Sequence, residues 1–196
     1  MSTLTRKLKP YYEQVVDPLI GFLERKNVNP NYVTLFGLVS VGFGSYFLYK
    51  EESFLAFFLL LLGALSDSID GAIARKMQKA SPFGAFLDST VDRFSDAFPF
   101  IAMGVNFSSE GDGLGTLLSF LALTSSFGVS YTRARAEGLG VHGLGGLFER
   151  TERWIVLLLG ILLGLWKLSL LVIFVGSLLT VIQRVRETKK ALEVLR

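Results

Sequence analysis

Six apolar stretches follow one another along this chain of 196 residues, separated by short polar segments. A helix that crosses a membrane needs about 20 mostly apolar residues, with a range of roughly 17–25, and most of the stretches are of this length. They cover residues 33–49, 53–74, 84–107, 114–132, 150–166 and 168–183. With 51% hydrophobic residues and a mean hydropathy of +0.47, the chain has more apolar side chains than a soluble domain of this size can bury. We therefore predict an all-α integral membrane protein with six transmembrane helices.

The residues before the first stretch predict a helix that lies on the membrane surface. Apolar side chains such as Leu8, Tyr12 and Val15 recur at helical spacing, and charged residues fill much of the rest. This pattern is typical of an amphipathic interfacial helix, although a surface helix on a soluble core would share it. We expect an N-terminal juxtamembrane amphipathic helix over residues 1–28 and a six-helix membrane domain over residues 29–196.

The basic residues predict the orientation in the membrane. If the N-terminus is cytosolic and each stretch crosses once, 18 of the 20 Lys and Arg residues fall at or near cytosolic ends, and Lys50 and Lys167 lie outside. Cytosolic loops of membrane proteins carry such an excess of basic residues. We therefore expect both termini on the cytosolic side of the cell (cytoplasmic) membrane.

Two residue counts limit the chemistry of the chain. It has no cysteine and one histidine, His142, which excludes disulfides, thiolate metal sites, cysteine nucleophiles and metal sites built from several histidines. The net charge of +3 is modest, and we expect no nucleic-acid partner. A metal site in this chain would use oxygen ligands.

The main chemical signal is a set of aspartates at the cytosolic ends of the second and third stretches. Asp67 and Asp70 share one helical face, and Asp88, Asp92 and Asp96 share another. An Asp at the centre of a membrane helix costs about 2.5–3.5 kcal/mol, and four carboxylates in one site need counter-charge. Two Mg²⁺ ions would supply it, with Mn²⁺ or Ca²⁺ as alternatives. Because Mg²⁺ often keeps a substrate phosphate among its ligands, the pattern indicates phosphoryl transfer at the cytosolic face.

Two other interpretations of these acids stay open. They could be acids at helix ends that pair with Arg75, Lys76 and Arg93. They could also mark the path of an ion or proton transporter, because intramembrane carboxylates are common there. Against a transporter, the acids cluster near one membrane face, and the sequence shows no repeat of broken helices.

The acidic segment resembles the signature of a known family. The pattern Asp67-x2-Asp70-Gly71-x2-Ala74-Arg75-x8-Gly84-x3-Asp88-x3-Asp92 fixes eight positions over 26 residues and is similar to that of the CDP-alcohol phosphotransferases. Members are Mg²⁺-dependent membrane enzymes with six transmembrane helices and an N-terminal surface helix, usually homodimers. The resemblance therefore implies the same fold, a Mg²⁺-dependent reaction and a homodimer.

The resemblance also implies roles for particular residues. Asp67, Asp70 and Asp88 would ligate one metal ion, and Asp67, Asp88 and Asp92 a second, with Asp92 as the general base. Asp96, outside the signature, is expected to support these carboxylates or to pair with an arginine. The residues expected to bind the CDP part of the lipid are Asn31, Thr34, Gly71, Arg75, Ser81 and Gly84.

A second basic set indicates the acceptor. Five arginines lie at the cytosolic ends of the last three stretches: Arg133, Arg135, Arg150, Arg153 and Arg184. Converging guanidinium groups bind phosphate well, although the positive-inside rule alone also places basic residues there. The segments 133–139 and 145–153 resemble the inositol-phosphate branch of the family, the phosphatidylinositol-phosphate and archaetidylinositol-phosphate synthases. Two departures are Arg133, where Lys is common, and Thr151, where Pro is common.

The resemblance implies a specific reaction. The phosphatidyl or archaetidyl group of CDP-diacylglycerol or CDP-archaeol would pass to 1L-myo-inositol 1-phosphate with release of CMP, in phospholipid biosynthesis. Glycerol 3-phosphate, also a phosphomonoester, is the alternative acceptor. The sequence does not distinguish the two lipids, because both kinds of tail fit an apolar groove.

Overall fold

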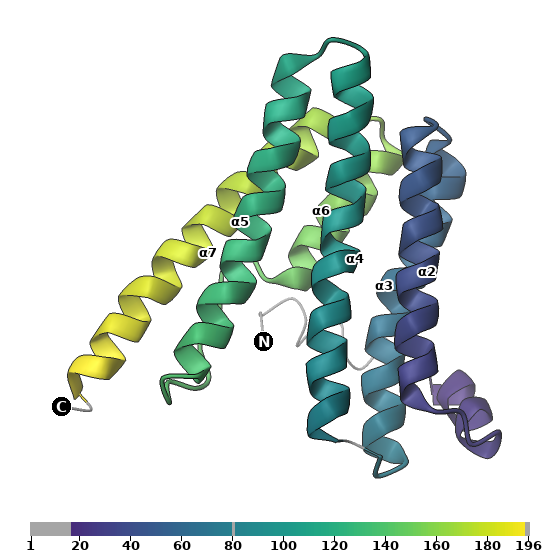
Figure 1. The fold of residues 1–196 in the computed structure, drawn as a ribbon, viewed down its shortest axis with the longest axis vertical. Helices are drawn as coiled ribbons and strands as arrows, with labels where there is room; N and C mark the ends of the chain where they lie inside the picture. Colours follow the sequence, from purple (N-terminus) through teal and green to yellow (C-terminus); the bar gives the residue numbers. More distant parts are fainter. Residues whose placement is uncertain (1–16, 80, 195–196) are drawn as a thin grey trace. The chain divides into compact units, whose positions relative to one another are not determined.

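The computed structural model describes residues 17–79 and 81–194, and within these ranges the regular secondary structure is entirely helical. Figure 1 shows the helices in chain order. Residues 17–25 form α1, followed by α2 (Pro30–Tyr49), α3 (Ser53–Lys76), α4 (Pro82–Ser109), α5 (Gly113–Glu137), α6 (Arg150–Leu162) and α7 (Trp166–Val194). The predicted all-α fold is confirmed. The first 16 residues of the predicted N-terminal helix lie outside the described ranges.

Each predicted apolar stretch contains a helix, but the helices differ in their capacity to cross a membrane. By length and composition, α2, α3, α5 and α7 are long and apolar enough to span it. The helix α4 has 28 residues, yet its first half carries the acids of the third stretch. The helix α6 has 13 residues, or about 20 Å at 1.5 Å per residue, against an apolar core of about 30 Å. The prediction of six spans is therefore supported for four helices.

The turn after α6 explains why that helix is shorter than its apolar stretch. Gly164 has a φ of +67°, a left-handed conformation that ends helices and favours glycine. The Leu165 amide donates a hydrogen bond to the Gly160 carbonyl at 2.8 Å across this turn. The chain then enters α7 directly, at Trp166.

The chain divides into two compact units, one ending at Ala102 and the other beginning at Met103. The first unit contains the pair of α2 and α3, which pack against each other along their length (Figure 1). Asn29 caps α2 by accepting a hydrogen bond from the Asn31 amide at 3.0 Å, and Pro30 is the first helical residue. Both are preferred at helix starts.

Small side chains let α2 and α3 approach closely. A Cβ atom on Gly63 would lie 2.3 Å from Val41 Cγ2 and 3.0 Å from the Gly37 carbonyl oxygen. Ser40 Oγ donates a hydrogen bond to the Leu59 carbonyl at 2.9 Å across the same interface. Membrane helices associate through such contacts because lipid supplies little hydrophobic drive between them.

The second unit contains α5 and α7 side by side, with α6 packed against α7 (Figure 1). Where α5 begins, Asp112 binds Lys167 of α7 at 2.8 Å, and the hydrogen bond from Lys167 holds the pKa of Asp112 below its usual value. The Phe107 and Trp166 rings pack edge to face, 6.0 Å apart. These contacts hold the end of α4 and the start of α5 against the start of α7.

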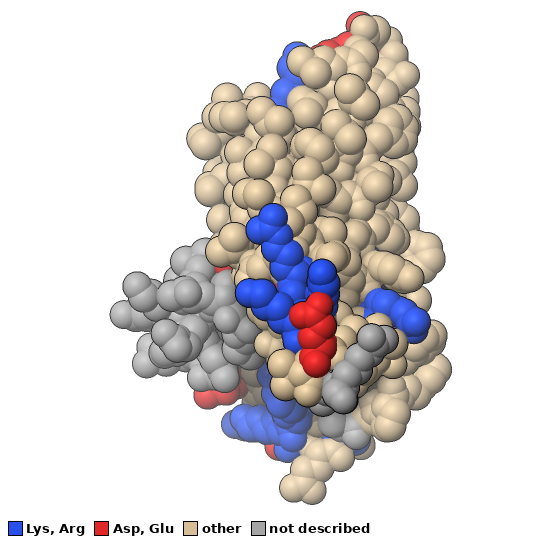
Figure 2. All heavy atoms as spheres, turned by 90° about the vertical axis from the view of Figure 1, so that its left-hand side faces the viewer, with Lys and Arg blue, Asp and Glu red and all other residues tan. Residues whose placement is uncertain are grey.

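The charge along α7 changes abruptly. Between Leu168 and Gln183 the sequence has no charged residue, whereas Arg184 to Glu193 contains six. Figure 2 shows charged side chains gathered below an uncharged surface on this face of the molecule. The change places the membrane–water boundary of α7 near Arg184.

Candidate active site

Three aspartates from two helices come together in the first unit. One carboxylate oxygen from each of Asp67, Asp88 and Asp92 lies within 4.8 Å of the others, and each residue is partly buried. Asp67 is on α3, and Asp88 and Asp92 are one turn apart on α4. The acidic faces of the two helices therefore meet, as their spacing predicts. Three carboxylates converging from two helices suit a divalent cation with hard oxygen ligands.

Asp70, the fourth predicted ligand, has a different environment. It is buried and does not belong to the group of three. Its Oδ2 accepts a hydrogen bond from the hydroxyl of Thr34 on α2, and that hydroxyl also lies 3.3 Å from the Pro30 carbonyl. The sequence predicted Thr34 as a contact of the CDP group, but in this structure it holds a predicted metal ligand.

Three other predicted CDP contacts are neighbours at the start of α4. Ser81 caps this helix, because its Oγ accepts a hydrogen bond from the Gly84 amide at 3.0 Å. A Cβ atom on Gly84 would lie 3.1 Å from Ser81 Oγ and 3.8 Å from Asn31 Oδ1. Gly84 therefore lies close to two polar side chains, one from the start of α4 and one from α2.

The remaining two predicted CDP contacts, Gly71 and Arg75, lie one turn apart on α3. A Cβ atom on Gly71 would lie 3.4 Å from a guanidinium nitrogen of Arg75, so the arginine side chain extends back along the helix over the glycine. This brings a cation toward the turn that carries Asp70. A guanidinium group there is suited to hydrogen-bond a phosphate.

One of the ion pairs proposed for the acids is present in the structure. Arg93 Nη2 lies 3.4 Å from Asp92 Oδ2, whereas Lys76 pairs with Glu24 of α1 at 3.6 Å. Asp96 is buried. Asp92 therefore has a cationic neighbour while its carboxylate also faces Asp67 and Asp88.

Three of the five predicted arginines are close in the second unit. Arg184 on α7 experiences the positive charges of Arg133, at the end of α5, and Arg153, on α6. Arg133 is exposed and pairs with Glu137 at 2.9 Å, whereas Arg153 is 4% exposed. These three side chains come from three different helices.

Arg184 has a structural function that the sequence did not predict. It is buried and donates hydrogen bonds to the carbonyls of Gly145, at 3.0 Å, and Val129, at 2.5 Å. It also lies 3.4 Å from Glu149 Oε1. The residue thereby ties α7 to α5 and to the loop before α6.

Glu149 is a residue that the sequence analysis missed. It forms a capping box with Glu152 at the start of α6, in addition to its ion pair with Arg184. The two acids are three residues apart, and this spacing just before an apolar run is a signal for such a cap.

The other two predicted arginines, Arg150 and Arg135, have further contacts of their own. The Arg150 guanidinium lies over the Trp154 ring, 5.9 Å from its centre. Arg135 lines a groove between α5 and α7 that has none of the other four among its lining residues. Arg133 and Arg135 are two residues apart, or about 200° around a helix, so they face different surfaces.

Comparison with known proteins identifies the family. A sequence profile described as CDP-alcohol phosphatidyltransferase matches residues 27–183, most of the chain. The chain belongs to this family. It is therefore an enzyme of the transferase class and an integral membrane protein, and the transporter interpretation is wrong. The whole acidic signature from Asp67 to Asp92 lies inside the matched range.

Relatives of this family member span nearly its full length. An uncharacterized protein of Aquifex aeolicus is 70% identical over all of both chains. An archaetidylinositol phosphate synthase of Pyrococcus horikoshii is 36% identical over 96% of this chain and 98% of its own. The predicted site residues therefore all lie in the length that this chain shares with the Aquifex protein.

Solved structures of a related enzyme share the fold. The phosphatidylinositol phosphate synthase of Mycobacterium tuberculosis with CDP-DAG bound is 29% identical and has a TM-score of 0.79 over 89% of this chain and 94% of its own. A second structure of that enzyme, in complex with manganese and citrate, has the same TM-score over 87% of each chain. The donor set of Asp67, Asp88 and Asp92 fits a divalent cation of this kind.

Proposed function

We propose that this enzyme transfers the phosphatidyl or archaetidyl group of a CDP-lipid to 1L-myo-inositol 1-phosphate, with release of CMP. The observation that carries the proposal is the convergence of Asp67, Asp88 and Asp92 within 4.8 Å in a member of this family. Support for the acceptor comes from the synthase names of the relatives and from the arginines of α5, α6 and α7.

Asp67, Asp70, Asp88 and Asp92 would hold two Mg²⁺ or Mn²⁺ ions. Bound there, the ions would neutralise the pyrophosphate and the charge that develops on departing CMP. The structure supports this role for three of the residues through their shared carboxylate cluster. Asp70 would join them with its orientation set by the Thr34 hydroxyl.

Asp92 is the proposed general base. Its carboxylate would remove a proton from an inositol hydroxyl, whose oxygen then bonds to the β-phosphorus that carries the lipid. The bond from that phosphorus to the oxygen shared with the α-phosphate breaks, and CMP leaves. Arg93 Nη2, 3.4 Å from Asp92 Oδ2, would help to orient this carboxylate.

The CDP group would bind beside this cluster. Asn31, Ser81 and Gly84 lie together at the start of α4 and would offer polar contacts. Gly71 and Arg75 would offer close backbone approach and a cation. Arg75 would bind a phosphate of the pyrophosphate group.

The acceptor phosphate would bind to Arg133 and Arg153, beside Arg184. The charges of Arg133 and Arg153 act on Arg184, and a phosphate dianion would relieve this repulsion. Because Arg184 already donates to two carbonyls, its main contribution would be to hold the other elements in place.

The proposal also includes the setting in the membrane. Residues 29–196 would form a six-helix domain, with residues 1–28 as a surface helix, both termini in the cytosol, the active site at the cytosolic face and two chains forming a homodimer. The basic residues at one set of helix ends support this orientation.

A panel of acceptors tests the proposal. Purified enzyme is supplied with CDP-diacylglycerol or CDP-archaeol, Mg²⁺ and one of four acceptors, namely inositol 1-phosphate, glycerol 3-phosphate, free inositol or serine. Release of CMP and the lipid product are measured. Turnover with inositol 1-phosphate well above the others is expected. A preference for glycerol 3-phosphate would assign the enzyme to the branch of the family that uses this acceptor. Turnover of free inositol or serine would contradict a phosphate-binding role of the arginines.

A further inference from the structure

The proposed reaction leaves unused a groove that Arg135 lines. It lies between the C-terminal parts of α5 and α7 and has a volume of about 470 Å³. Its walls combine uncharged and charged side chains: Tyr131, Thr132, Arg135, Ala136, Leu139, Val185, Thr188, Lys189, Leu192 and Glu193. We propose that this groove binds an anionic phospholipid of the surrounding bilayer.

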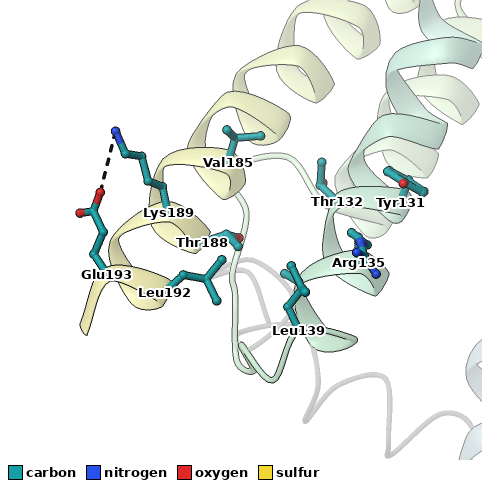
Figure 3. A pocket seen from close by; sticks show the side chains of 10 residues that line it. Tyr131, Thr132, Arg135, Leu139, Val185, Thr188, Lys189, Leu192 and Glu193 are labelled. Carbon is teal, nitrogen blue, oxygen red and sulfur yellow. Dashed lines mark ion pairs between the residues drawn. The ribbon is translucent and has the colours of Figure 1, made fainter. Parts of the chain in front are cut away.

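The groove has an apolar interior and a basic edge. Figure 3 shows Leu139 and Leu192 pointing toward the space between the two helices, whereas Lys189 lies at the outer side with Glu193. Leu139, Tyr131 and Val185 are exposed apolar residues. One side of the groove thus suits an acyl chain, and the cations suit an anionic headgroup.

The groove lies at the level where the membrane surface is expected. The uncharged part of α7 ends just before Arg184, and Val185 to Leu192 extend from there by about 10 Å at 1.5 Å per residue. The headgroup layer on each side of a bilayer is about 5–8 Å thick. Tyr131, on the α5 wall, is of the residue type enriched at this level. The groove therefore extends across the headgroup layer to the edge of the apolar core.

The two cations are available for an anion. Within the described part of the chain, Arg135 forms no ion pair. Lys189 Nζ lies 3.9 Å from Glu193 Oε1, and these side chains are 77% and 63% exposed. An exposed pair of this kind holds its members weakly. With Glu193 the only acid on the wall, the two cations leave the groove with a net positive charge.

The site differs from the proposed acceptor site. Arg133, Arg153 and Arg184 do not line the groove, and Arg133 is about 200° away from Arg135 around α5. Binding of a lipid here would join the ends of α5 and α7 without occupying the acceptor arginines. The inference therefore stands whether or not inositol 1-phosphate is the acceptor.

Native mass spectrometry of the purified full-length protein tests this inference. The protein is mixed with equimolar phosphatidylglycerol and phosphatidylcholine, and retention of each lipid is measured. Phosphatidylglycerol should be retained preferentially. The double variant Arg135→Gln, Lys189→Gln should lose this preference by about fivefold for each charge removed, the effect of one basic residue near an anionic surface.

A double variant with both changes on α7 is the control. Arg186 and Lys190 are exposed and do not line the groove, so Arg186→Gln, Lys190→Gln removes the same charge elsewhere on α7. It should retain the preference of the unmodified protein. If both double variants lose the preference equally, the preference comes from general surface charge, and the proposal is overturned.

Two further arms separate the possible sources of binding. Leu192→Ser should weaken retention of both lipids, because it removes apolar contact while leaving the cations. Inorganic phosphate at millimolar concentration should not displace the phosphatidylglycerol. Displacement by phosphate, or equal retention of the two lipids by the unmodified protein, would overturn the proposal. Thermal unfolding of every variant checks that each is folded, and phosphatidylglycerol should raise the midpoint of the unmodified protein more than that of Arg135→Gln, Lys189→Gln.

Discussion

The hydroxyl of Thr34 on α2 donates a hydrogen bond to the carboxylate of Asp70 on α3, and both side chains are buried. The two residues are 36 positions apart in the chain. Asp70 is one turn from Asp67, which belongs to the carboxylate cluster. The hydrogen bond therefore connects the packing of α2 against α3 with the orientation of a proposed metal ligand.

Thr34→Val should lower the affinity of the enzyme for Mg²⁺. Valine has nearly the shape of threonine but donates no hydrogen bond, so Asp70 loses the group that orients it. Loss of such a supporting partner costs roughly 10- to 100-fold in metal affinity or activity. A Mg²⁺ titration of the initial rate measures this, and Thr34→Ser should restore most of the affinity. An unchanged titration curve for Thr34→Val would show that the hydrogen bond has no such function.

Asp67→Asn and Asp88→Asn should each abolish turnover while the protein still inserts and folds, because each residue is a proposed ligand of both ions. Activity should require Mg²⁺ or Mn²⁺ and disappear when a chelator is added. Asp17→Asn provides a control with the same chemical change at an exposed position of α1, and it should remain active. Full activity of the unmodified enzyme in excess EDTA would disprove metal dependence.

Asp92→Asn should lower kcat much more than it weakens binding of the CDP-lipid. The amide cannot accept the proton of the inositol hydroxyl, whereas Asp67, Asp70 and Asp88 still offer ligands for at least one ion. Equilibrium binding of CDP-diacylglycerol, compared with single-turnover release of CMP, separates the two effects. If the variant binds no CDP-lipid, Asp92 acts chiefly as a ligand, and Asp96 becomes the next residue to test as the base.

Arg133→Gln should raise the KM for inositol 1-phosphate and leave that for the CDP-lipid nearly unchanged. A charge-assisted hydrogen bond contributes about 1.5–3 kcal/mol, which corresponds to a loss of roughly 10- to 100-fold in kcat/KM. Stability should change little, because the ion pair of Arg133 with Glu137 is exposed. Steady-state kinetics with each substrate varied in turn measures the split. Equal losses for both substrates would show that Arg133 serves insertion or folding instead.

Arg184→Gln should lower the thermal unfolding midpoint as well as activity, in contrast to Arg133→Gln. The change removes donors to the carbonyls of Val129 and Gly145 and the buried cation that lies 3.4 Å from Glu149. Removing one member of a buried ion pair costs about 3–5 kcal/mol. Thermal unfolding in detergent measures the shift. An unchanged midpoint with a raised KM for inositol phosphate alone would assign Arg184 to the acceptor rather than to the framework.

Much of the fold and of the acidic site could be predicted from local spacing. The lengths of the apolar stretches predicted the helices, because a helix in lipid satisfies its own backbone hydrogen bonds. The intervals Asp67 to Asp70 and Asp88 to Asp92 placed each pair on one helical face, since 3.6 residues complete a turn. A short turn between α3 and α4 then allows those faces to meet, as Asp67, Asp88 and Asp92 do.

The basic residues show where sequence alone was insufficient. Charge and position grouped five arginines, yet Arg184 is buried against the Val129 carbonyl, 55 residues away, and Arg135 lies in a separate groove. Thr34 likewise binds Asp70 across 36 residues. Helical periodicity determines which side chains share a face of one helix. Only the packing of the helices against one another decides which distant groups those side chains meet, because hydrogen bonds between helices depend on their contacts and not on their separate sequences.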